Sequence, residues 1–383
     1  METLEILDRL IAFPTISADS NLAIIDYIQD FLTARGFAVH RVPDKTGLKA
    51  GLFARIGPGD CAGVLLSGHT DVVPVTGQNW TTDPFRMRVA DGRAYGRGTT
   101  DMKGYLASML VLADRAARVE LKQPLKLAFS FDEEIGCVGI RSMIDRLSET
   151  IGLPDMCFVG EPTMMQVAVG HKGKVALRAS CHGMSGHSAM APNFLNALHL
   201  ATDFVSVLRE IQSDFAANGV QDADYGVPYS TIHVARISGG RALNIVPEMA
   251  EVDFEFRHLV ADNPDDILAR ITAAAQKLGA AYQARFPVAN IDVQKRLAYP
   301  GLDTDPDSEV VLQAQKLALA TGTTKVAFGT EAGYFSTQLG IPTIVCGPGS
   351  MDDQGHQPDE HVTLSQLVAC DTMFGRLLRE ILG

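Results

Sequence analysis

The stretch Gly63-Val-Leu-Leu-Ser-Gly-His-Thr-Asp-Val-Val-Pro74 decides the fold, because it joins a short apolar run to a turn-rich phrase that carries His69 and Asp71. An apolar run of this length, bounded by turn signals, is typical of a buried strand. Similar runs occupy 125–130 and 155–159, and helical spacing occupies 3–13, 20–35 and 102–117. Strands that alternate with helices predict an α/β domain with a mostly parallel mixed sheet flanked by helices. Ligands of such sheets bind at the carboxyl ends of the strands.

Carboxylates and imidazoles gather in glycine- and turn-rich phrases, most of which follow these strands. They are His69, Asp71, Asp101, Glu133, Glu134, Glu161 and His356. Oxygen and imidazole donors together suit a borderline divalent metal. We therefore predict a hydrolase with two metal ions.

Each of these residues also has a simpler interpretation when it is taken alone. Asp71 could cap a turn beside an ordinary histidine, and Asp101 could be the N-cap of the helix that follows it. Glu133 and Glu134 could lie in a solvated turn. Adjacent acids at the end of a buried strand raise each other's pKa, however, unless a cation lies beside them. Alternation points one acid toward a metal and the other toward a bound water, and the residues alone leave open which is which.

The pattern of the chain changes near residue 174. Alternating strands are expected at 174–181, 229–237 and 248–258, helices at 193–211 and 264–278, and an extended segment at 281–293. This β-α-β-β-α-β order predicts a ferredoxin-like α+β unit. We expect 174–295 to be a lid inserted into a catalytic domain formed by 1–173 and 296–383, with 214–229 as a loop.

Composition excludes several classes of function. The chain has 383 residues and a formal net charge of -12, and no run of Lys and Arg offers a surface to nucleic acid. No apolar stretch approaches the roughly 20 residues of a membrane span, and the N-terminus lacks the pattern of a secretory signal. Six scattered cysteines indicate free thiols in a reducing compartment. We expect a cytoplasmic protein with a small-molecule substrate and no nucleic-acid or membrane partner.

The polar phrases, taken in order, resemble those of the co-catalytic zinc deacylases and exopeptidases. The matching segments run from end to end of the chain and are Gly68–Pro74, Gly96–Gly104, Asp132–Gly139, Gly160–Thr163, Gly186–Ser188 and Gly355–Glu360. The resemblance implies two divalent ions per chain, with zinc favoured over cobalt or manganese. It also implies a homodimer formed through the inserted domain.

The resemblance assigns a role to each matching residue. His69, Asp101 and Glu161 would hold one metal, and Asp101, Glu134 and His356 would hold the other. Glu133 would be the general base, and Asp71 would orient the first histidine. Three residues of the inserted domain complete the assignment. His187 would be supplied to the active site of the dimer partner. Asn244 and Arg257 would hold the α-carboxylate of the substrate.

Three further phrases point to one branch of the family. They are Gly-His-Lys-Gly (170–173), Gly-Gln-Asn-Trp (77–80) with Asp-Pro-Phe (83–85), and Gly-Thr-Glu-Ala-Gly-Tyr-Phe (329–335). They resemble the branch that hydrolyses N2-acetyl-L-ornithine to acetate and L-ornithine. We expect Gly329, Thr330 and Glu331 to bind substrate, with Glu331 either meeting the ammonium group or lying on the surface.

Other readings remain open at this point. Within the family they are a succinyl-diaminopimelate desuccinylase, another N-acyl-amino-acid deacylase or a dipeptidase. Outside it, a non-catalytic metal-binding module is disfavoured, because Glu133 and all five metal ligands are present.

Overall fold

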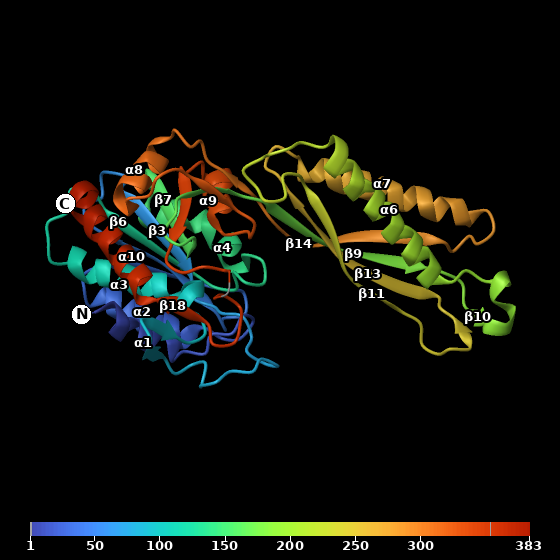
Figure 1. The fold of residues 1–383 in the computed structure, drawn as a ribbon, viewed down its shortest axis with the longest axis horizontal. Coiled ribbons are helices and arrows are strands. Elements are labelled where there is room, and N and C mark those ends of the chain that lie inside the picture. Colours follow the sequence, from blue (N-terminus) through green and yellow to red (C-terminus); the bar gives the residue numbers. More distant parts are fainter. Residues whose placement is uncertain (1, 353) are drawn as a thin grey trace. The chain divides into compact units, whose positions relative to one another are not determined.

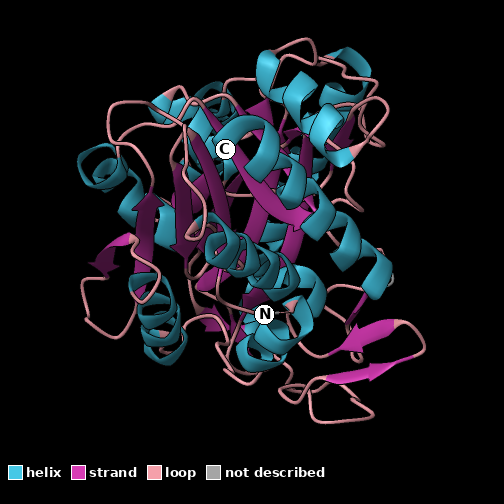
Figure 2. Cartoon of the chain, turned by 90° about the vertical axis from the view of Figure 1, so that its left-hand side faces the viewer, coloured by secondary structure: helices cyan, strands magenta, loops and turns pink. Residues whose placement is uncertain are grey.

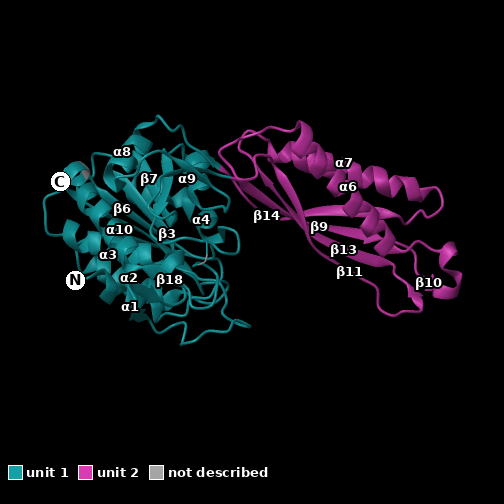
Figure 3. Cartoon of the chain, in the orientation of Figure 1, with its two compact units in different colours: residues 1–171, 302–383 teal, residues 172–301 magenta. Residues whose placement is uncertain are grey.

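The computed structural model describes residues 2–352 and 354–383. The chain forms two compact units, which are coloured separately in Figure 3: unit 1 comprises residues 1–171 and 302–383, and unit 2 comprises residues 172–301. The sequence placed the second junction at 295, but strand β14 (Asn290–Tyr299) continues past that point and belongs to unit 2.

A mixed nine-stranded sheet forms the centre of unit 1 (Figure 1). Its order is β1 (Ala38–Pro43), β2 (Ala50–Ile56), β6 (Leu125–Ser130), β3 (Val64–His69), β7 (Met156–Pro162), β17 (Thr343–Gly347), β8 (Ala168–His171) and β15 (Leu302–Asp303), and β16 (Thr324–Val326) also pairs with β8. The central strands β6, β3, β7 and β17 are parallel, whereas β1, β2 and β15 pair antiparallel at the edges. The predicted α/β class is confirmed.

Helices cover both faces of this sheet, as Figure 2 shows. One face packs against the apolar sides of α1 (Thr3–Ile11), α2 (Leu22–Thr33), α3 (Gly104–Ala116), α8 (Glu309–Ala318) and α10 (Leu364–Leu377). The other face carries α4 (Val138–Met143), α5 (Leu147–Ile151) and α9 (Ala332–Leu339). Beside the main sheet, β18 (His361–Thr363), β5 (Arg93–Tyr95) and β4 (Arg88–Ala90) form a small antiparallel sheet.

Unit 2 has the predicted β-α-β-β-α-β order. Its antiparallel sheet runs β11 (Thr231–Gly239), β13 (Met249–His258), β9 (Gly173–His182) and β14, and α6 (Ala197–Asn218) and α7 (Pro264–Gln283) pack on one face. Burial alternates along β9 and β13, since one face meets the helices and the other carries charged side chains. A short ribbon, β10 (Gly186–His187) with β12 (Ile245–Val246), extends from this unit.

Several element boundaries differ from the sequence prediction, with large differences at the ends of α6 and α7. The prediction of an extended segment at 281–293 is wrong for the first part of that range, because α7 continues to Gln283 and β14 begins only at Asn290. The added turn of α7 contacts α6, since the hydroxyl of Tyr282 donates to Asp203 at 2.6 Å. The loop expected at 214–229 is also shorter, because α6 continues to Asn218.

All six cysteines are unpaired, and five of them are buried. Among the helices in the part of the chain that the structure describes, none combines the length and apolar character needed to cross a membrane.

Candidate metal centre

Three parallel strands deliver side chains to one end of the sheet. His69 is the last residue of β3 and lies opposite Ser130, the last residue of β6, so the chain leaves β6 toward Glu133 and Glu134 beside that histidine. On the other side of β3, Ser67 pairs with Val159 of β7. Because side chains alternate along a strand, Glu161 therefore faces the same side as His69.

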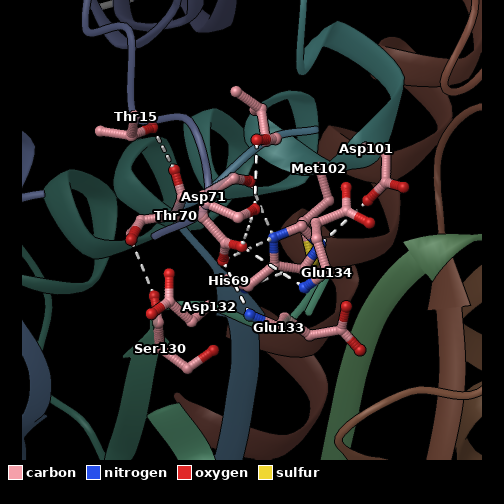
Figure 4. Close-up of polar contacts among 12 residues, drawn as sticks. Thr15, His69, Thr70, Asp71, Asp101, Met102, Ser130, Asp132, Glu133 and Glu134 are labelled. Atoms are coloured by element: carbon pink, nitrogen blue, oxygen red, sulfur yellow. Dashed lines mark hydrogen bonds and ion pairs between the residues drawn. The ribbon is translucent and has the colours of Figure 1, made fainter. Parts of the chain in front are cut away.

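His69 is the centre of the first group of contacts, and Figure 4 shows it beside Asp71 and Asp101. Its Nε2 lies 2.9 Å from Oδ1 of Asp101 and 3.6 Å from Oε1 of Glu161. Its Nδ1 lies 3.0 Å from the carbonyl oxygen of Asp71 and 3.4 Å from Oδ1 of the same residue. The imidazole is thus oriented by Asp71, while its other nitrogen faces two carboxylates.

His356 brings a second group of contacts to Asp101. Its Nε2 lies 3.0 Å from Oδ2 of Asp101 and 3.0 Å from Oε2 of Glu134. Asp101 therefore presents one oxygen to each histidine, across sequence separations of 32 and 255 residues. This is the arrangement expected of a carboxylate that bridges two cations.

The capping interpretation fails for Asp101 and describes only part of the role of Asp71. The side chain of Asp101 faces the two histidines, and helix α3 begins three residues later at Gly104. Asp71 accepts hydrogen bonds from the Ser17 hydroxyl at 2.7 Å and from the backbone N–H of Glu133 at 3.0 Å. It therefore holds the turn that carries the two glutamates as well as the imidazole.

Burial of so many carboxylates perturbs their protonation. Burial is the main cause that raises the pKa of Glu133 to about 8 and that of Glu134 to about 7, and it also raises the pKa of Glu161 well above its ordinary value. Burial opposes protonation of His356, but hydrogen bonds to Asp101 and Glu134 overcome it and raise the pKa to about 10. These raised pKa values mean that, without a bound cation, protons neutralise part of the negative charge of the cluster.

The residues fit a pair of divalent metal ions. Oε1 of Glu161 is buried and accepts no hydrogen bond, which leaves it available as a ligand. Among the described residues, His69, Glu133 and Glu161 bring potential ligand atoms within 4.8 Å of one another, and so do His69, Asp101 and Glu134. Nitrogen and oxygen donors without thiolate suit zinc, cobalt or manganese.

Glu331 has contacts that the sequence did not indicate. It is 1% exposed, and its carboxylate accepts hydrogen bonds from the hydroxyls of Ser67 at 2.5 Å and Ser130 at 2.6 Å. Thr330 is also buried, and its hydroxyl accepts a hydrogen bond from the N–H of Ala332 at the start of α9. Glu331 is therefore not a surface residue, and it lies beneath His69 on the same face of the sheet.

Sequence reasoning also missed Glu360. This buried residue ends the Gly355–Glu360 phrase, and its Oε1 accepts hydrogen bonds from the backbone N–H groups of Gly98, Thr100 and Asp101 at 3.0 to 3.1 Å. The one available signal was its place in the same phrase as His356. The Gly355–Glu360 phrase thus supplies the candidate ligand His356 and, through Glu360, a hydrogen bond that holds the backbone of the candidate ligand Asp101.

The predicted residues of unit 2 fall into two places. His187 and Asn244 lie together on the exposed β10–β12 ribbon, where the N–H of Ser188 donates to the carbonyl of Asn244 at 3.0 Å. Arg257 lies eight residues beyond Met249 along β13, which is about 26 Å at the usual rise of a strand. Its Nε donates to Glu255 at 3.0 Å. Within one chain the structure does not bring Asn244 and Arg257 together.

Fold and donor set together indicate a class: a metal-dependent hydrolase with an α/β catalytic domain, whose candidate metal ligands lie at the ends of parallel strands. The chain belongs to peptidase family M20/M25/M40, whose model matches residues 65–380. It is a metal-dependent amide hydrolase of that family.

Known proteins are similar to the chain over nearly its whole length. The acetylornithine deacetylase of Salmonella arizonae is 34% identical over 367 residues, covering 94% of this chain and 92% of the relative. Among solved structures, an M20 family metallo-carboxypeptidase from Sulfolobus solfataricus has a TM-score of 0.80 at 20% identity, with 99% of each chain covered. A dinuclear metal-binding peptidase of the family from Bacillus subtilis has a TM-score of 0.69 at 16% identity, covering 98% of this chain and 96% of that one.

The raised pKa values predict that metal binding releases protons. At pH 6.5 Glu133, Glu134 and His356 are mostly protonated in the metal-free protein, and ligands must lose their protons to bind. Calorimetric titration with Zn²⁺ in buffers of different ionisation enthalpy should show release of at least about one proton per chain. Affinity should rise with pH, and His356→Ala should release fewer protons. A heat of binding that is the same in all buffers would contradict this interpretation.

Proposed function

We propose that the chain removes the acetyl group from N2-acetyl-L-ornithine, giving acetate and L-ornithine. The observation that carries the proposal is the full-length similarity to the acetylornithine deacetylase of Salmonella arizonae. The phrases at 77–80, 170–173 and 329–335 support the same branch. The contacts that His69 and His356 make with Asp101 and with the neighbouring carboxylates support an intact catalytic site.

The proposed metal ligands follow the two groups of contacts. His69, Asp101 and Glu161 would hold one ion, and Asp101, Glu134 and His356 would hold the other, with zinc as the proposed metal. When bound, the two cations would acidify a water molecule and polarise the carbonyl of the amide. The contacts of Asp101 with both histidines support its role as the bridge.

Glu133 is the proposed general base. Its backbone N–H is fixed by Asp71, and the thiol of Cys137 donates to its Oε1 at 3.2 Å, so its carboxylate is held beside the cluster. Glu133 would take a proton from the attacking water and deliver it to the leaving amine nitrogen. Burial raises the pKa of Glu133 to about 8 without metal, and two bound cations would lower it again, so that the carboxylate could accept the proton of the attacking water.

We further propose that two subunits complete each site in a cytoplasmic homodimer formed through unit 2. His187 is exposed and would donate a hydrogen bond to the oxyanion in the partner's site. Asn244 shares the ribbon of His187 and would accompany it, and Arg257 would bind the α-carboxylate of the substrate. Leu243 beside Asn244 is entirely exposed, which supports an interface at this ribbon.

Gly329, Thr330 and Glu331 are proposed to border the substrate pocket. Because both oxygens of Glu331 accept hydroxyl hydrogen bonds, its charge would favour the ornithine ammonium through space.

A substrate panel tests the proposed reaction. We expect kcat/KM for N2-acetyl-L-ornithine to exceed that for N-succinyl-diaminopimelate and for simple dipeptides by at least about 100-fold, a factor that a few well-placed polar contacts supply. Metal content is measured on the same sample. A fully metallated enzyme that prefers the succinylated substrate or a dipeptide would refute the acetylornithine assignment while leaving the amide-hydrolase class intact.

Glu133→Gln tests whether Glu133 acts as the general base and not as a metal ligand. The variant should retain both metal ions and lose at least about 100-fold in kcat, because only proton transfer is removed. Glu134→Gln is the matched control at the neighbouring position and should lower metal content instead. Near-normal kcat in a fully metallated Glu133→Gln would overturn the assignment of the base.

Mixing two inactive variants tests the role of His187. If it acts in the partner's site, heterodimers of His187→Ala with Glu133→Gln contain one site with both residues intact, so part of the activity should return. Subunit exchange is verified by differential tagging. Absence of recovery in proven heterodimers would mean that His187 does not act across the dimer.

A further inference from the structure

Gln78 connects the loop of His356 to a buried arginine. Its Nε2 donates to the backbone carbonyl of His356 at 2.9 Å. Its Oε1 accepts from Nη2 of Arg97 at 2.5 Å and from the indole N–H of Trp80 at 3.0 Å. One carboxamide therefore joins the Gly-Gln-Asn-Trp phrase to the Gly-Arg-Gly phrase and to the loop that carries a candidate metal ligand.

Arg97 extends this connection to Asp101. The guanidinium is wholly buried, and its Nη1 donates to Oε2 of Glu360 at 2.5 Å. Oε1 of Glu360 in turn accepts the backbone N–H of Asp101 at 3.1 Å. A continuous series of hydrogen bonds thus runs from the carbonyl of His356 through Gln78, Arg97 and Glu360 to the backbone of Asp101.

His356 is the candidate ligand that most needs such support. Its side chain is 42% exposed, whereas those of Asp101 and Glu134 are 6% and 7% exposed. It lies in a loop, and its φ of +61° is a left-handed conformation that non-glycine residues adopt at a cost. His69, by contrast, is fixed by strand β3 and by Asp71.

We propose that Gln78 is a positioning residue for the second metal ion, the one assigned to Asp101, Glu134 and His356. Its amide N–H fixes the peptide of His356, so that the imidazole nitrogen stays within reach of Asp101 and Glu134. The first ion, held by His69, Asp101 and Glu161, does not depend on this hydrogen bond. The proposal rests on the two-metal function proposed above.

Gln78→Glu is the most specific test. The substituted carboxylate keeps an acceptor for Arg97 and Trp80 but loses the donor to His356. Metal-free full-length protein is titrated with Co²⁺, and each binding step is followed by calorimetry and by the visible absorption of the bound ion. We expect the second ion to bind about 10- to 100-fold more weakly than in the wild type, with the first ion within about twofold.

Thr81→Val is the matched control between the same two loops. It removes the hydroxyl hydrogen bond from Thr81 to Asp359, at 2.9 Å, without touching His356 or Arg97. We expect its second ion to bind within about threefold of the wild type, below the loss expected of a residue that supports a metal ligand. If Gln78→Glu proves unstable, Gln78→Met is measured in its place; it adds no charge, and it removes the acceptor of Arg97 and Trp80 together with the donor to His356.

Three outcomes would overturn the proposal. They are unchanged affinity for the second ion in the folded Gln78 variant, equal weakening of both ions, and a loss in Thr81→Val as large as that in the Gln78 variant. Either of the last two outcomes would mean that the hydrogen bond from Gln78 to His356 anchors the loop in general and does not support the second ion in particular. Failure of the two-metal function is seen separately, because the wild-type protein would then bind fewer than two ions.

Discussion

The sharing of Asp101 between two histidines is the constraint on which the rest of unit 1 depends. One oxygen of its carboxylate faces His69 and the other faces His356. The first histidine ends a central strand, but the second comes from a loop 255 residues beyond Asp101 in the chain. Asp101 must therefore be held in place independently of both. The glycine-rich turn before it and the carboxylate of Glu360 fulfil this requirement.

The electrostatic state of the centre follows from the same packing. Glu133, Glu134 and Glu161 are brought together with Asp101 where little water reaches them, and burial raises the pKa of all three glutamates. Two divalent cations would replace the protons and remove the repulsion between the carboxylates. The stability of the site and its chemistry thus depend on the same ions.

The sequence predicts those parts of the structure that rest on local patterns. The apolar run at 125–130 becomes β6 with the same bounds, and the alternation after residue 174 becomes the antiparallel sheet of unit 2. Glu360 and Gln78 escaped prediction because their partners lie across the fold, and no periodicity marks a hydrogen bond between two loops. The separation of Asn244 from Arg257 follows from the length of β13, since the eight residues from Met249 to Arg257 span about 26 Å.

The most direct test of the central claim is the anomalous scattering of a crystal grown with Zn²⁺ and measured above and below the zinc edge. We predict two zinc peaks on either side of the carboxylate of Asp101. One should contact His69 and Glu161, and the other should contact Glu134 and His356. A single peak, or two peaks of which only one contacts Asp101, would contradict the account.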